Sequence, residues 1–463
     1  MASNIINKIA GNKLLQNVGW MGVAEVMARV SRLLTAVVLA RILTPVEFGI
    51  IAIAMTTYDF LMVVTKNGAG AKIIQAADGE LQDVCNTVNR VNWVISSGLF
   101  VLQCLIAFPV AIFYGEQEIA YLIMMLACVY LIQPIVMVRV YLIQRSNKLK
   151  YTGLAFGFGV TIDNIVSAIL ALSGFGVWSV VYPKILVAVL WVVFHLYIQP
   201  WKATDGVHKK HFKEIVDFSK NVLGTEFLKI YRSNIDRLLI GHFLGLEILG
   251  IYYFAVNAAL GITLSLMSAF NTAFYPYLCS LQRQKDTFYT RYIRSLKLIC
   301  IGSIVLIGTQ GFLTQYYVPL VFGEQWIDSI PLVMIMVLSA IPRPLAEVTG
   351  QMFRAIGKPQ IELNWNMIFS AIFTVAICIG LRKDIIDMAY AVFIVHMVMI
   401  PIYVLWSCAY YLPGNQIPGT RILPVFDFIN EFSNVCAIAI NQYSGETIVY
   451  FGSVMLYQSI LNI

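Results

Sequence analysis

The chain has 463 residues, of which 59% are hydrophobic and 12% are charged, and its formal net charge is +7. Soluble domains are about 45–50% apolar and about 25% charged, so this composition excludes an ordinary soluble protein and indicates an integral membrane protein. The positive excess then belongs to loops on one side of a membrane rather than to a nucleic-acid-binding surface. The eight cysteines are scattered without a C-x-x-C pair, which predicts neither a disulfide framework nor a metal site.

Apolar runs of about 20 residues, the length that crosses a bilayer, recur along the chain. Six of them precede a polar stretch, at 18–43, 47–65, 88–113, 119–142, 152–172 and 177–197. Six more follow it, at 215–243, 247–277, 293–318, 330–352, 361–381 and 386–411. The sequence therefore predicts an N-terminal lobe (1–198), a basic cytoplasmic linker (199–214) and a C-terminal lobe (215–412). The segments within 413–463 are short or polar, so a thirteenth and fourteenth span and interfacial helices both remain open there.

Charges between the spans predict the orientation, because cytoplasmic loops carry an excess of lysine and arginine. If the N-terminus lies in the cytoplasm, the cytoplasmic loops hold Lys66, Lys72, Arg90, Arg139, Arg145, Lys148, Lys150, Lys202, Lys209, Lys210, Lys213, Arg283, Lys285, Arg291, Arg294, Lys297, Arg354 and Lys358. The opposite loops, such as "GEQE" and "GEQW", are poor in basic residues, and only Arg382 and Lys383 break the pattern. Both ends of the twelve-span core are therefore predicted to be cytoplasmic.

The two six-span halves suggest an internal repeat, and an offset of 201 residues gives weak support for it. The stretch "ARILTPVEFGIIAIA" (40–54) aligns with "GHFLGLEILGIYYFA" (241–255), so that Gly49 matches Gly250. Apolar sequences match easily by chance, and the identities are few. Because each half has an even number of spans, the repeats are expected to be parallel, related by an axis along the membrane normal.

The first predicted span carries charges on one side. Glu25, Arg29 and Arg32 have the spacing i, i+4, i+7, which places them on one helix face. A charged residue at the bilayer centre costs about 2.5–3.5 kcal/mol on insertion scales. This face is therefore predicted to look into the helix bundle or into a hydrated cavity rather than into lipid.

The seventh predicted span has a similar pattern. Glu226, Lys229 and Asp236 lie near one face, and Arg232 and Arg237 flank it. If the two halves are parallel repeats, the first and seventh spans occupy equivalent positions, and their charged faces are expected to line one central cavity with surplus positive charge.

Two interpretations of these charges are open. The arginines can line a cavity for an anionic substrate, because a guanidinium group binds phosphate oxygens in pairs. Alternatively, Glu25 can pair with Arg29, and Glu226 with Lys229, as structural ion pairs that lock the lobes. The cavity is favoured because Glu25 cannot neutralise both arginines of its helix. Asp59 in the second span either binds a coupling cation or pairs with one of these arginines.

Several stretches resemble a known family in the expected order. These are "RILTPVEFGIIAIA" at 41–54, "GFGVWSVV" at 174–181, "NIDRLLIGHFLGLEILGIYYFA" at 234–255, "FGEQWIDSIP" at 322–331 and "FRAIGKPQIELNWN" at 353–366. Over roughly residues 14–411 the chain resembles Wzx-type and colanic-acid-exporter-like polysaccharide flippases. That family belongs to the multidrug/oligosaccharidyl-lipid/polysaccharide (MOP) exporter superfamily.

The resemblance implies an all-α membrane protein with 12–14 transmembrane helices in two parallel six-helix lobes that form a V and alternate access between the two sides. It implies a flippase for a lipid-linked oligosaccharide on undecaprenyl diphosphate, in the bacterial cytoplasmic (inner) membrane. Such a protein serves the biosynthesis of a surface polysaccharide: O-antigen of lipopolysaccharide, capsule or exopolysaccharide. The family's cationic cavity would correspond to Arg29, Arg32, Lys229, Arg232 and Arg237.

No G-x-x-x-x-G-K-[ST] motif occurs, so no ATP hydrolysis by this chain is predicted. We expect a transporter without enzymatic activity, cofactor or metal. Its candidate carboxylates for coupling to H⁺ or Na⁺ are Glu25, Asp59, Glu226 and Asp236. We expect it to act as a monomer beside glycosyltransferases and a polysaccharide polymerase.

Three other functions are alternatives to a flippase. A multidrug or small-metabolite exporter of the same superfamily would favour an acidic cavity, because its substrates are commonly cations. A membrane enzyme acting on lipid-linked sugars would need a large extracytoplasmic loop, and every predicted outside loop is short. A non-transporting component of a glycan assembly complex stays open, although it would leave the arginines within the spans without a task.

Overall fold

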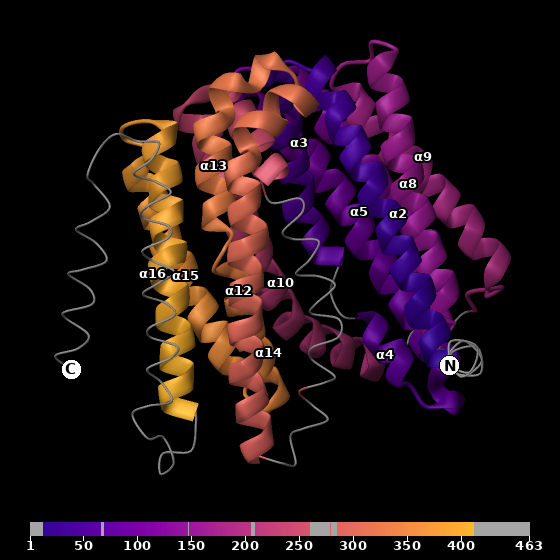
Figure 1. Cartoon of the computed structure of the whole chain (residues 1–463). Coiled ribbons are helices and arrows are strands. Elements are labelled where there is room, and N and C mark those ends of the chain that lie inside the picture. Colours follow the sequence, from indigo (N-terminus) through magenta and orange to yellow (C-terminus); the bar gives the residue numbers. More distant parts are fainter. Residues whose placement is uncertain are drawn as a thin grey trace, which may run out of the picture. The chain divides into compact units, whose positions relative to one another are not determined.

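The computed structural model describes residues 13–65, 69–146, 148–204, 209–259, 278 and 285–411, and its regular structure in this part of the chain is helical (Figure 1). Helices are expected here, because a segment in lipid must satisfy its backbone hydrogen bonds internally. Each of the twelve predicted spans falls on one helix or, for the fourth and the tenth, on two consecutive helices, and the eighth is described only up to Ala259. The segments predicted within 413–463 lie outside the described residues.

Helices of the first half follow the predicted spans closely. They are α2 (Lys13–Ile42), α3 (Pro45–Met62), α4 (Ala69–Gln75), α5 (Leu81–Tyr114), α6 (Glu118–Ile132), α7 (Pro134–Arg145), α8 (Leu149–Leu172) and α9 (Trp178–Ile198). Short 3-10 turns cover Val63–Thr65 and Asp78–Glu80. The fourth predicted span is bent by 53° between α6 and α7, where Pro134 begins the second helix.

Helices of the second half continue the series. They are α10 (Lys209–Phe243), the helix Gly245–Ala259, α12 (Lys285–Tyr317), α13 (Ile330–Ser339), α14 (Arg343–Ala355), α15 (Pro359–Gly380) and α16 (Ile385–Tyr411). A π-helical turn, Val318–Phe322, and a 3-10 helix, Glu324–Ser329, connect α12 to α13. The tenth predicted span is divided into α13 and α14 by a turn around Ala340–Pro342, which includes the helix-breaking Pro342.

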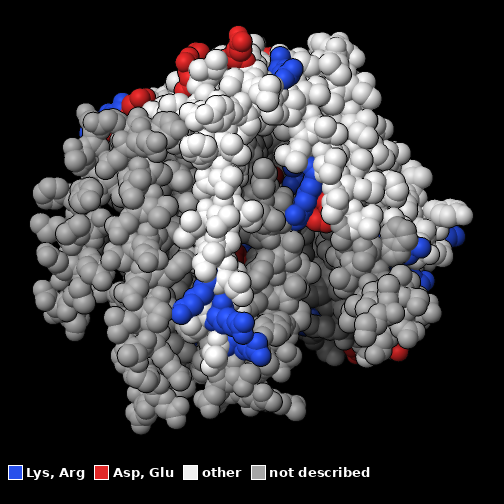
Figure 2. Space-filling view, viewed as in Figure 1, with Lys and Arg blue, Asp and Glu red and all other residues white. Residues whose placement is uncertain are grey.

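Length and hydropathy make this a multi-pass membrane protein. Within the described ranges, eight helices are long and apolar enough to span a bilayer, and the bent α6–α7 pair would be a ninth. The two helices with charged faces, α2 and α10, are outside this set. On the face seen in Figure 2, most of the described surface is uncharged, and the charged side chains form a few separate groups.

The described helices group into two compact units. Unit 1 contains Met1–Phe254 together with Val318–Ile327, and unit 2 contains Ala255–Tyr317 and Asp328–Ile463. Unit 1 thus includes α10, which the sequence assigned to the C-terminal lobe, because α10 packs on α3 and α5. The predicted division into lobes at 199–214 is a statement about transport units and stays a prediction.

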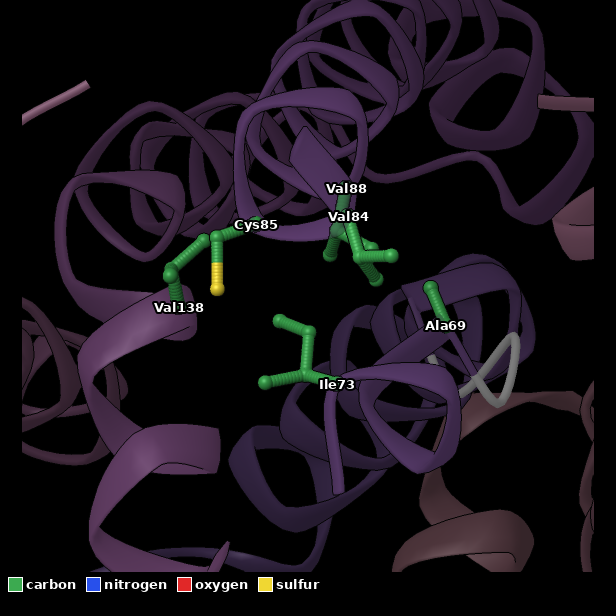
Figure 3. Close-up of a cluster of buried hydrophobic side chains, with 6 residues drawn as sticks. All are labelled: Ala69, Ile73, Val84, Cys85, Val88 and Val138. Atoms are coloured by element: carbon green, nitrogen blue, oxygen red, sulfur yellow. The ribbon is translucent and has the colours of Figure 1, made fainter. Parts of the chain in front are cut away.

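A small apolar core supports unit 1 where α4, α5 and α7 meet. Ala69 and Ile73 of α4 point toward Val84 and Val88 of α5 (Figure 3). The cluster is completed by two further buried side chains, Cys85 and Val138. Burying such side chains contributes about 1.5–3 kcal/mol for each large aliphatic group, which fixes the short α4 between the longer helices.

Unit 1 also contains a joint between the two sequence repeats. A Cβ atom at Gly49 of α3 would lie 2.0 Å from the carbonyl oxygen of Leu246, and one at Gly250 would lie 1.7 Å from that of Pro45. The offset of 201 residues that matches Gly49 with Gly250 also matches Pro45 with Leu246. The contact is therefore reciprocal, as expected where equivalent helices meet about a two-fold axis. This geometry supports the predicted repeat and explains both glycines, since any side chain would collide with backbone.

Hydrogen bonds beside this glycine contact also connect the two repeats. Arg41, at the end of α2, donates hydrogen bonds to the carbonyl oxygens of Leu320 (2.7 Å) and Val321 (2.9 Å). The Trp326 indole donates to the carbonyl oxygen of Ala40 at 2.7 Å. The segment that follows the ninth predicted span thus holds the end of the first.

The helices at the equivalent repeat positions, the third and the seventh spans, also meet at their ends. Tyr114, at the end of α5, donates its hydroxyl hydrogen bond to the carbonyl oxygen of Leu238 on α10 at 3.1 Å. His242 stacks on Phe113 with ring centres 4.4 Å apart. The end of the third span therefore holds the end of the seventh. We call the two glycines with the flanking contacts of Arg41, Trp326, Tyr114 and His242 the repeat joint.

Candidate functional site

The side of α2 that packs on α8 is small and polar. Ala24, Ala28, Ser31 and Thr35 are buried at helical spacing along it. The Asn164 amide of α8 donates to the Ser31 hydroxyl at 3.1 Å, and the Thr35 hydroxyl donates to the Asn164 carbonyl oxygen at 2.8 Å. Small side chains allow the two helices to approach closely, as is common in membranes.

The opposite side of α2 is apolar and exposed. Val26, Val30, Leu33 and Leu34 have exposed fractions of 60%, 53%, 51% and 64%. Because large apolar side chains with this exposure need an apolar solvent, this side is the lipid-facing one.

The charged face of α2 lies between these two sides. At about 100° per residue, Glu25, Arg29 and Arg32 stand roughly a quarter turn from the side that packs on α8. The Arg29 Nε atom donates to Glu25 Oε1 at 3.0 Å, so the predicted ion pair within the helix forms. Arg32 is exposed and has no ion pair or hydrogen bond in the part of the chain that the structure describes. One arginine of the face is therefore neutralised and the other is surplus.

Both nearest donors of Arg29 lie against the same carboxylate oxygen. Its side chain is 20% exposed, and its Nε and Nη2 atoms are each 3.0 Å from Glu25 Oε1. The Nε contact is a hydrogen bond, whereas the buried Nη2 atom makes an ion-pair contact without hydrogen-bond geometry. The face of α2 thus offers one guanidinium group paired with Glu25 and, about a helical turn away, the unpaired guanidinium group of Arg32.

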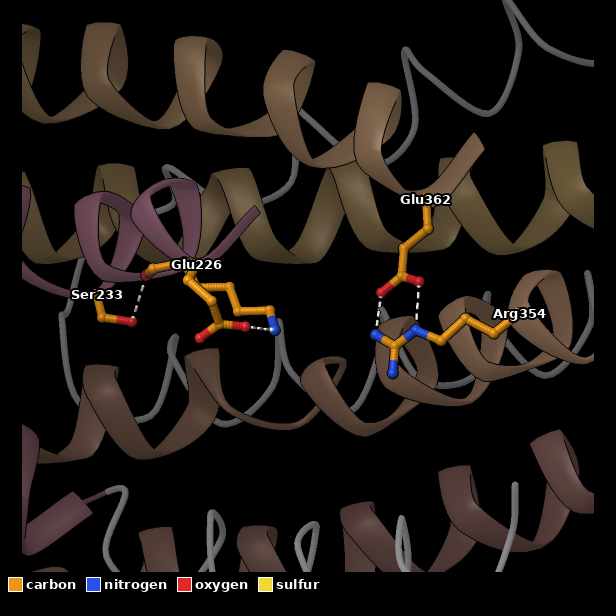
Figure 4. Close-up of polar contacts among 5 residues, drawn as sticks. Glu226, Ser233, Arg354 and Glu362 are labelled. Carbon is orange, nitrogen blue, oxygen red and sulfur yellow. Dashed lines mark hydrogen bonds and ion pairs between the residues drawn. The ribbon is translucent and has the colours of Figure 1, made fainter. Parts of the chain in front are cut away.

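The first part of the α10 charge pattern forms a second local ion pair. Lys229 Nζ lies 2.6 Å from Glu226 Oε1, and the Ser233 hydroxyl donates to the Lys229 carbonyl oxygen at 2.9 Å (Figure 4). The Lys229 side chain is 54% exposed. Such exposed pairs contribute about 0.2–1 kcal/mol, so the pair leaves the ammonium group accessible to a stronger anion.

The second part of the α10 pattern contacts the next helix. Asp236 is buried and accepts a hydrogen bond of 2.5 Å from the Tyr252 hydroxyl. Arg237 donates to the Asn234 side-chain oxygen at 2.8 Å, and its guanidinium carbon lies 4.9 Å from the centre of the Tyr253 ring. These contacts tie α10 to the helix Gly245–Ala259. Sequence reasoning missed this role, although the adjacent tyrosines in the next helix could have suggested partners.

The remaining predicted residues lie on the same unit. Arg232 of α10 and Asp59 of α3 are half-buried. All nine predicted site residues therefore belong to unit 1, on α2, α3 and α10. That their charged faces line one common cavity stays a prediction, because α2 packs mainly on α8 whereas α10 packs on α3 and α5.

One intramembrane ion pair was not predicted as a pair. Lys184 of α9 contacts Asp163 of α8 at 3.2 Å, and both side chains are about one-quarter exposed. The two residues stand at similar depths from the turn that joins α8 to α9, about 13 Å and about 9 Å at 1.5 Å per residue, and this signal could have revealed the pair. No group of His, Cys, Asp and Glu side chains suited to a metal ion occurs within the described ranges.

The middle of the chain matches a family model. Residues 38–331 match the family described as "Polysaccharide biosynthesis protein". The succinoglycan biosynthesis transport protein ExoT of Rhizobium meliloti (strain 1021) is 25% identical over 378 residues, which are 79% of this chain and 74% of that protein. The teichuronic acid biosynthesis protein TuaB of Bacillus subtilis (strain 168) is 22% identical over 362 residues, which are 76% of this chain and 74% of that protein.

Solved structures match the fold. The inward closed conformation of the lipid II flippase MurJ superimposes with a TM-score of 0.71 at 14% identity, and covers 95% of this chain and 96% of that one. An inward-facing multidrug MATE transporter of the MOP superfamily superimposes with a TM-score of 0.68 at 14% identity, and covers 82% of this chain and 93% of that one. The predicted all-α fold is therefore confirmed, and the chain shares it with these two transporters.

Proposed function

Because the chain belongs to the family of polysaccharide biosynthesis proteins, we propose that it moves an oligosaccharide repeat unit, linked to undecaprenyl diphosphate, across the bacterial cytoplasmic membrane. The product would be a surface polysaccharide such as O-antigen, capsule or exopolysaccharide. The similarity to ExoT, a succinoglycan biosynthesis transport protein, and the fold shared with a lipid II flippase support this proposal.

The observation that carries the proposal is the surplus of guanidinium groups on α2. Arg32 is exposed and unpaired among the described residues, about a helical turn from the Arg29–Glu25 pair, within a helix whose other outward side is apolar. Guanidinium groups match the spacing of phosphate oxygens and bind them with charge-assisted hydrogen bonds. A diphosphate is a suitable acceptor, because it offers several oxygens to both arginines at once.

The transport step follows from these residues. Moving a diphosphate through about 30 Å of hydrocarbon would strip its hydration, and arginines in a hydrated cavity replace that hydration. Lys229, Arg232 and Arg237 of α10 would contribute from the second repeat, while the lipid chain stays in the bilayer. Access would alternate as one repeat rocks against the other. In this account the protein is a transporter rather than an enzyme.

Two groups of residues have further proposed roles. Glu25, Asp59, Glu226 and Asp236 are the carboxylates through which H⁺ or Na⁺ would drive transport. The excess of lysine and arginine in alternate loops supports a cytoplasmic N-terminus. Glycosyltransferases would then complete the substrate on the cytoplasmic side, and a polysaccharide polymerase would receive it on the other side. The chain would work as a monomer.

Neutralisation of Arg32 tests the proposal in cells. Arg32→Gln should abolish surface display of the polysaccharide and trap the lipid-linked intermediate in the cytoplasmic leaflet, at protein levels matched to wild type. Arg382→Gln, an exposed arginine in a predicted outside loop, is the matched control and should display normally. Normal display in the Arg32 variant would overturn the substrate-binding role of α2.

A multidrug exporter is the second candidate, because the MATE transporter shares the fold. It predicts that deletion of the protein raises sensitivity to cationic drugs and leaves polysaccharide display unchanged. The surplus of positive charge on α2 disfavours cationic substrates, because like charges repel in a site of low dielectric.

A further inference from the structure

Helix α12 of unit 2 has one buried face. Tyr292, Leu296, Cys300, Ile307 and Thr314 are at most 5% exposed and recur at helical spacing. This face packs against α13 and α14 of the same unit. The orientation of α12 about its axis is therefore fixed by its own unit.

The opposite face of α12 is a long apolar stripe. Leu298, Ile301, Val305, Phe312 and Tyr316 are 65%, 51%, 58%, 57% and 60% exposed. At 1.5 Å per residue the stripe is about 27 Å long, close to the thickness of the hydrocarbon layer of about 30 Å. A single leaflet accounts for only about half of that length.

Basic side chains extend this stripe toward the start of the helix. Arg291 and Arg294 are exposed and Lys297 is half-buried, and at about 100° per residue they surround the direction of the apolar stripe. Among the described residues none of the three has an ion pair or a hydrogen bond, and residues 287–317 contain no acidic residue. In Figure 2 a blue group lies at the lower end of the region where Figure 1 draws α12.

At the N-terminal end of another helix of unit 2, α15, a basic side chain is paired with an acid. At the start of α15, Glu362 accepts a hydrogen bond from Arg354 Nε at 2.6 Å, and a second guanidinium nitrogen joins the pair (Figure 4). The exposed apolar side chains of α15 follow that closed pair. The basic group of α12, in contrast, forms no ion pair with an acid among the described residues, so its positive charge is available to an external anion.

We propose that the exposed apolar stripe of α12, together with the basic side chains that extend it, is a docking site for the polyprenyl diphosphate carrier of the substrate. Arg291, Arg294 and Lys297 bind the diphosphate, and the isoprenoid chain lies along the stripe from Leu298 to Tyr316. The three cations span about 9 Å along the helix, which suits a headgroup with more than one phosphate better than the single phosphate of a bulk phospholipid. A stripe longer than one leaflet suits a chain longer than a phospholipid acyl chain. This inference rests on the proposed function and adds a second, peripheral lipid site to it.

Lipid binding by the purified full-length protein tests the site. Native mass spectrometry would compare a polyprenyl diphosphate with the polyprenyl monophosphate of equal length and with phosphatidylglycerol. The triple variant Arg291→Gln, Arg294→Gln, Lys297→Gln should bind the diphosphate at least tenfold more weakly than wild type, since each basic residue adds to the attraction of an anionic headgroup. The triple variant Arg90→Gln, Arg382→Gln, Lys383→Gln removes the same charge elsewhere and should bind like wild type.

Two results would overturn the docking site. One is unchanged diphosphate binding in the α12 variant; the other is equal affinity of wild type for phosphatidylglycerol, which would make α12 a general anionic surface. A photoreactive polyprenyl diphosphate should label the peptide that contains residues 291–297 in wild type, which keeps the test valid if the variant folds poorly.

The same titrations separate this inference from the proposed function. They would be repeated in the background Arg29→Gln, Arg32→Gln, where the α12 contribution should persist. If only the Arg29→Gln, Arg32→Gln variant binds the diphosphate more weakly, the result supports the proposed function and contradicts the docking site. If wild type shows no preference for any polyprenyl diphosphate, both fail.

Discussion

At the scale of single residues, Arg29 and Arg32 have different surroundings although they share a helix face. Arg29 is held by Glu25 and is mostly buried, whereas Arg32 is exposed. The spacing predicted both the pair and the surplus arginine, because residues four apart meet on a helix. It could not predict which nitrogen of Arg29 forms the hydrogen bond to Glu25, since that depends on the exact angle of the guanidinium group.

We expect Glu25→Gln to act mainly on stability. Glutamine keeps the shape but removes the negative charge that neutralises Arg29, and hydrogen bonds to charged groups contribute about 1.5–3 kcal/mol. The variant should therefore unfold at a lower temperature than wild type in detergent, and Arg32→Gln should unfold like wild type. Equal melting temperatures for wild type and Glu25→Gln would show that the pair is not structural.

The Asp163–Lys184 ion pair connects α8 and α9, and its variants are expected to differ in stability. Asp163→Asn leaves the Lys184 ammonium group without its counter-ion inside the bundle, and breaking a buried pair costs more than removing both partners. The double variant Asp163→Asn, Lys184→Met should therefore be more stable than Asp163→Asn alone. Thermal unfolding of the three proteins would check this order, and a double variant less stable than the single one would contradict it.

At the scale of elements, the repeat joint depends on two glycines. Gly49→Ala or Gly250→Ala would place a methyl group within 2.0 Å of a carbonyl oxygen, so the helices must separate. We expect each variant to lower the melting temperature and to reduce polysaccharide display at matched protein levels.

The matched control for the joint is a helical glycine in open space. Gly302→Ala in α12 meets nothing within 4 Å and should be neutral or stabilising, since alanine favours a helix by up to about 1 kcal/mol. Joint variants that behave like Gly302→Ala would contradict the tight packing of the repeats.

Trp326 tests the other component of the joint. Its side chain is 1% exposed, donates to the Ala40 carbonyl oxygen and stacks on Phe254 with ring centres 3.9 Å apart. Trp326→Phe keeps most of the ring but loses the donor, so a loss of about 1 kcal/mol is expected, against about 3–5 kcal/mol for Trp326→Ala. Thermal unfolding would rank the variants, and equal effects would show that the hydrogen bond contributes nothing.

The helices themselves could be predicted from sequence because hydropathy and length determine a membrane span. The bend at Pro134 and the division of the tenth span were less predictable, since a proline in a membrane helix can either break it or be accommodated. Hydropathy predicts the segment Val318–Ile327 as the end of one span and a loop, and the structure shows that it packs into unit 1. Contacts between segments far apart in the chain are not encoded in local hydropathy.

At the scale of the whole molecule, composition and a chain of modest motifs were enough to predict the family and the fold, and both are confirmed. The candidate site was predictable only as two charged faces, because hydropathy marks the cost of Arg29 and Arg32 but not what they face. The partners of Asp236 and Arg237 came from the structure, where the adjacent helix supplies Tyr252 and Tyr253.

Transport by the purified protein is the most direct test of the account. The protein would be reconstituted into liposomes with a fluorescent oligosaccharide on polyprenyl diphosphate, and flipping would be measured by quenching of the label from outside. We predict flipping by wild type and by Arg382→Gln, and a rate at least tenfold lower for Arg32→Gln at equal reconstitution. Equal rates for liposomes with and without wild-type protein would contradict the proposed function, and equal rates for wild type and Arg32→Gln would contradict the role assigned to α2.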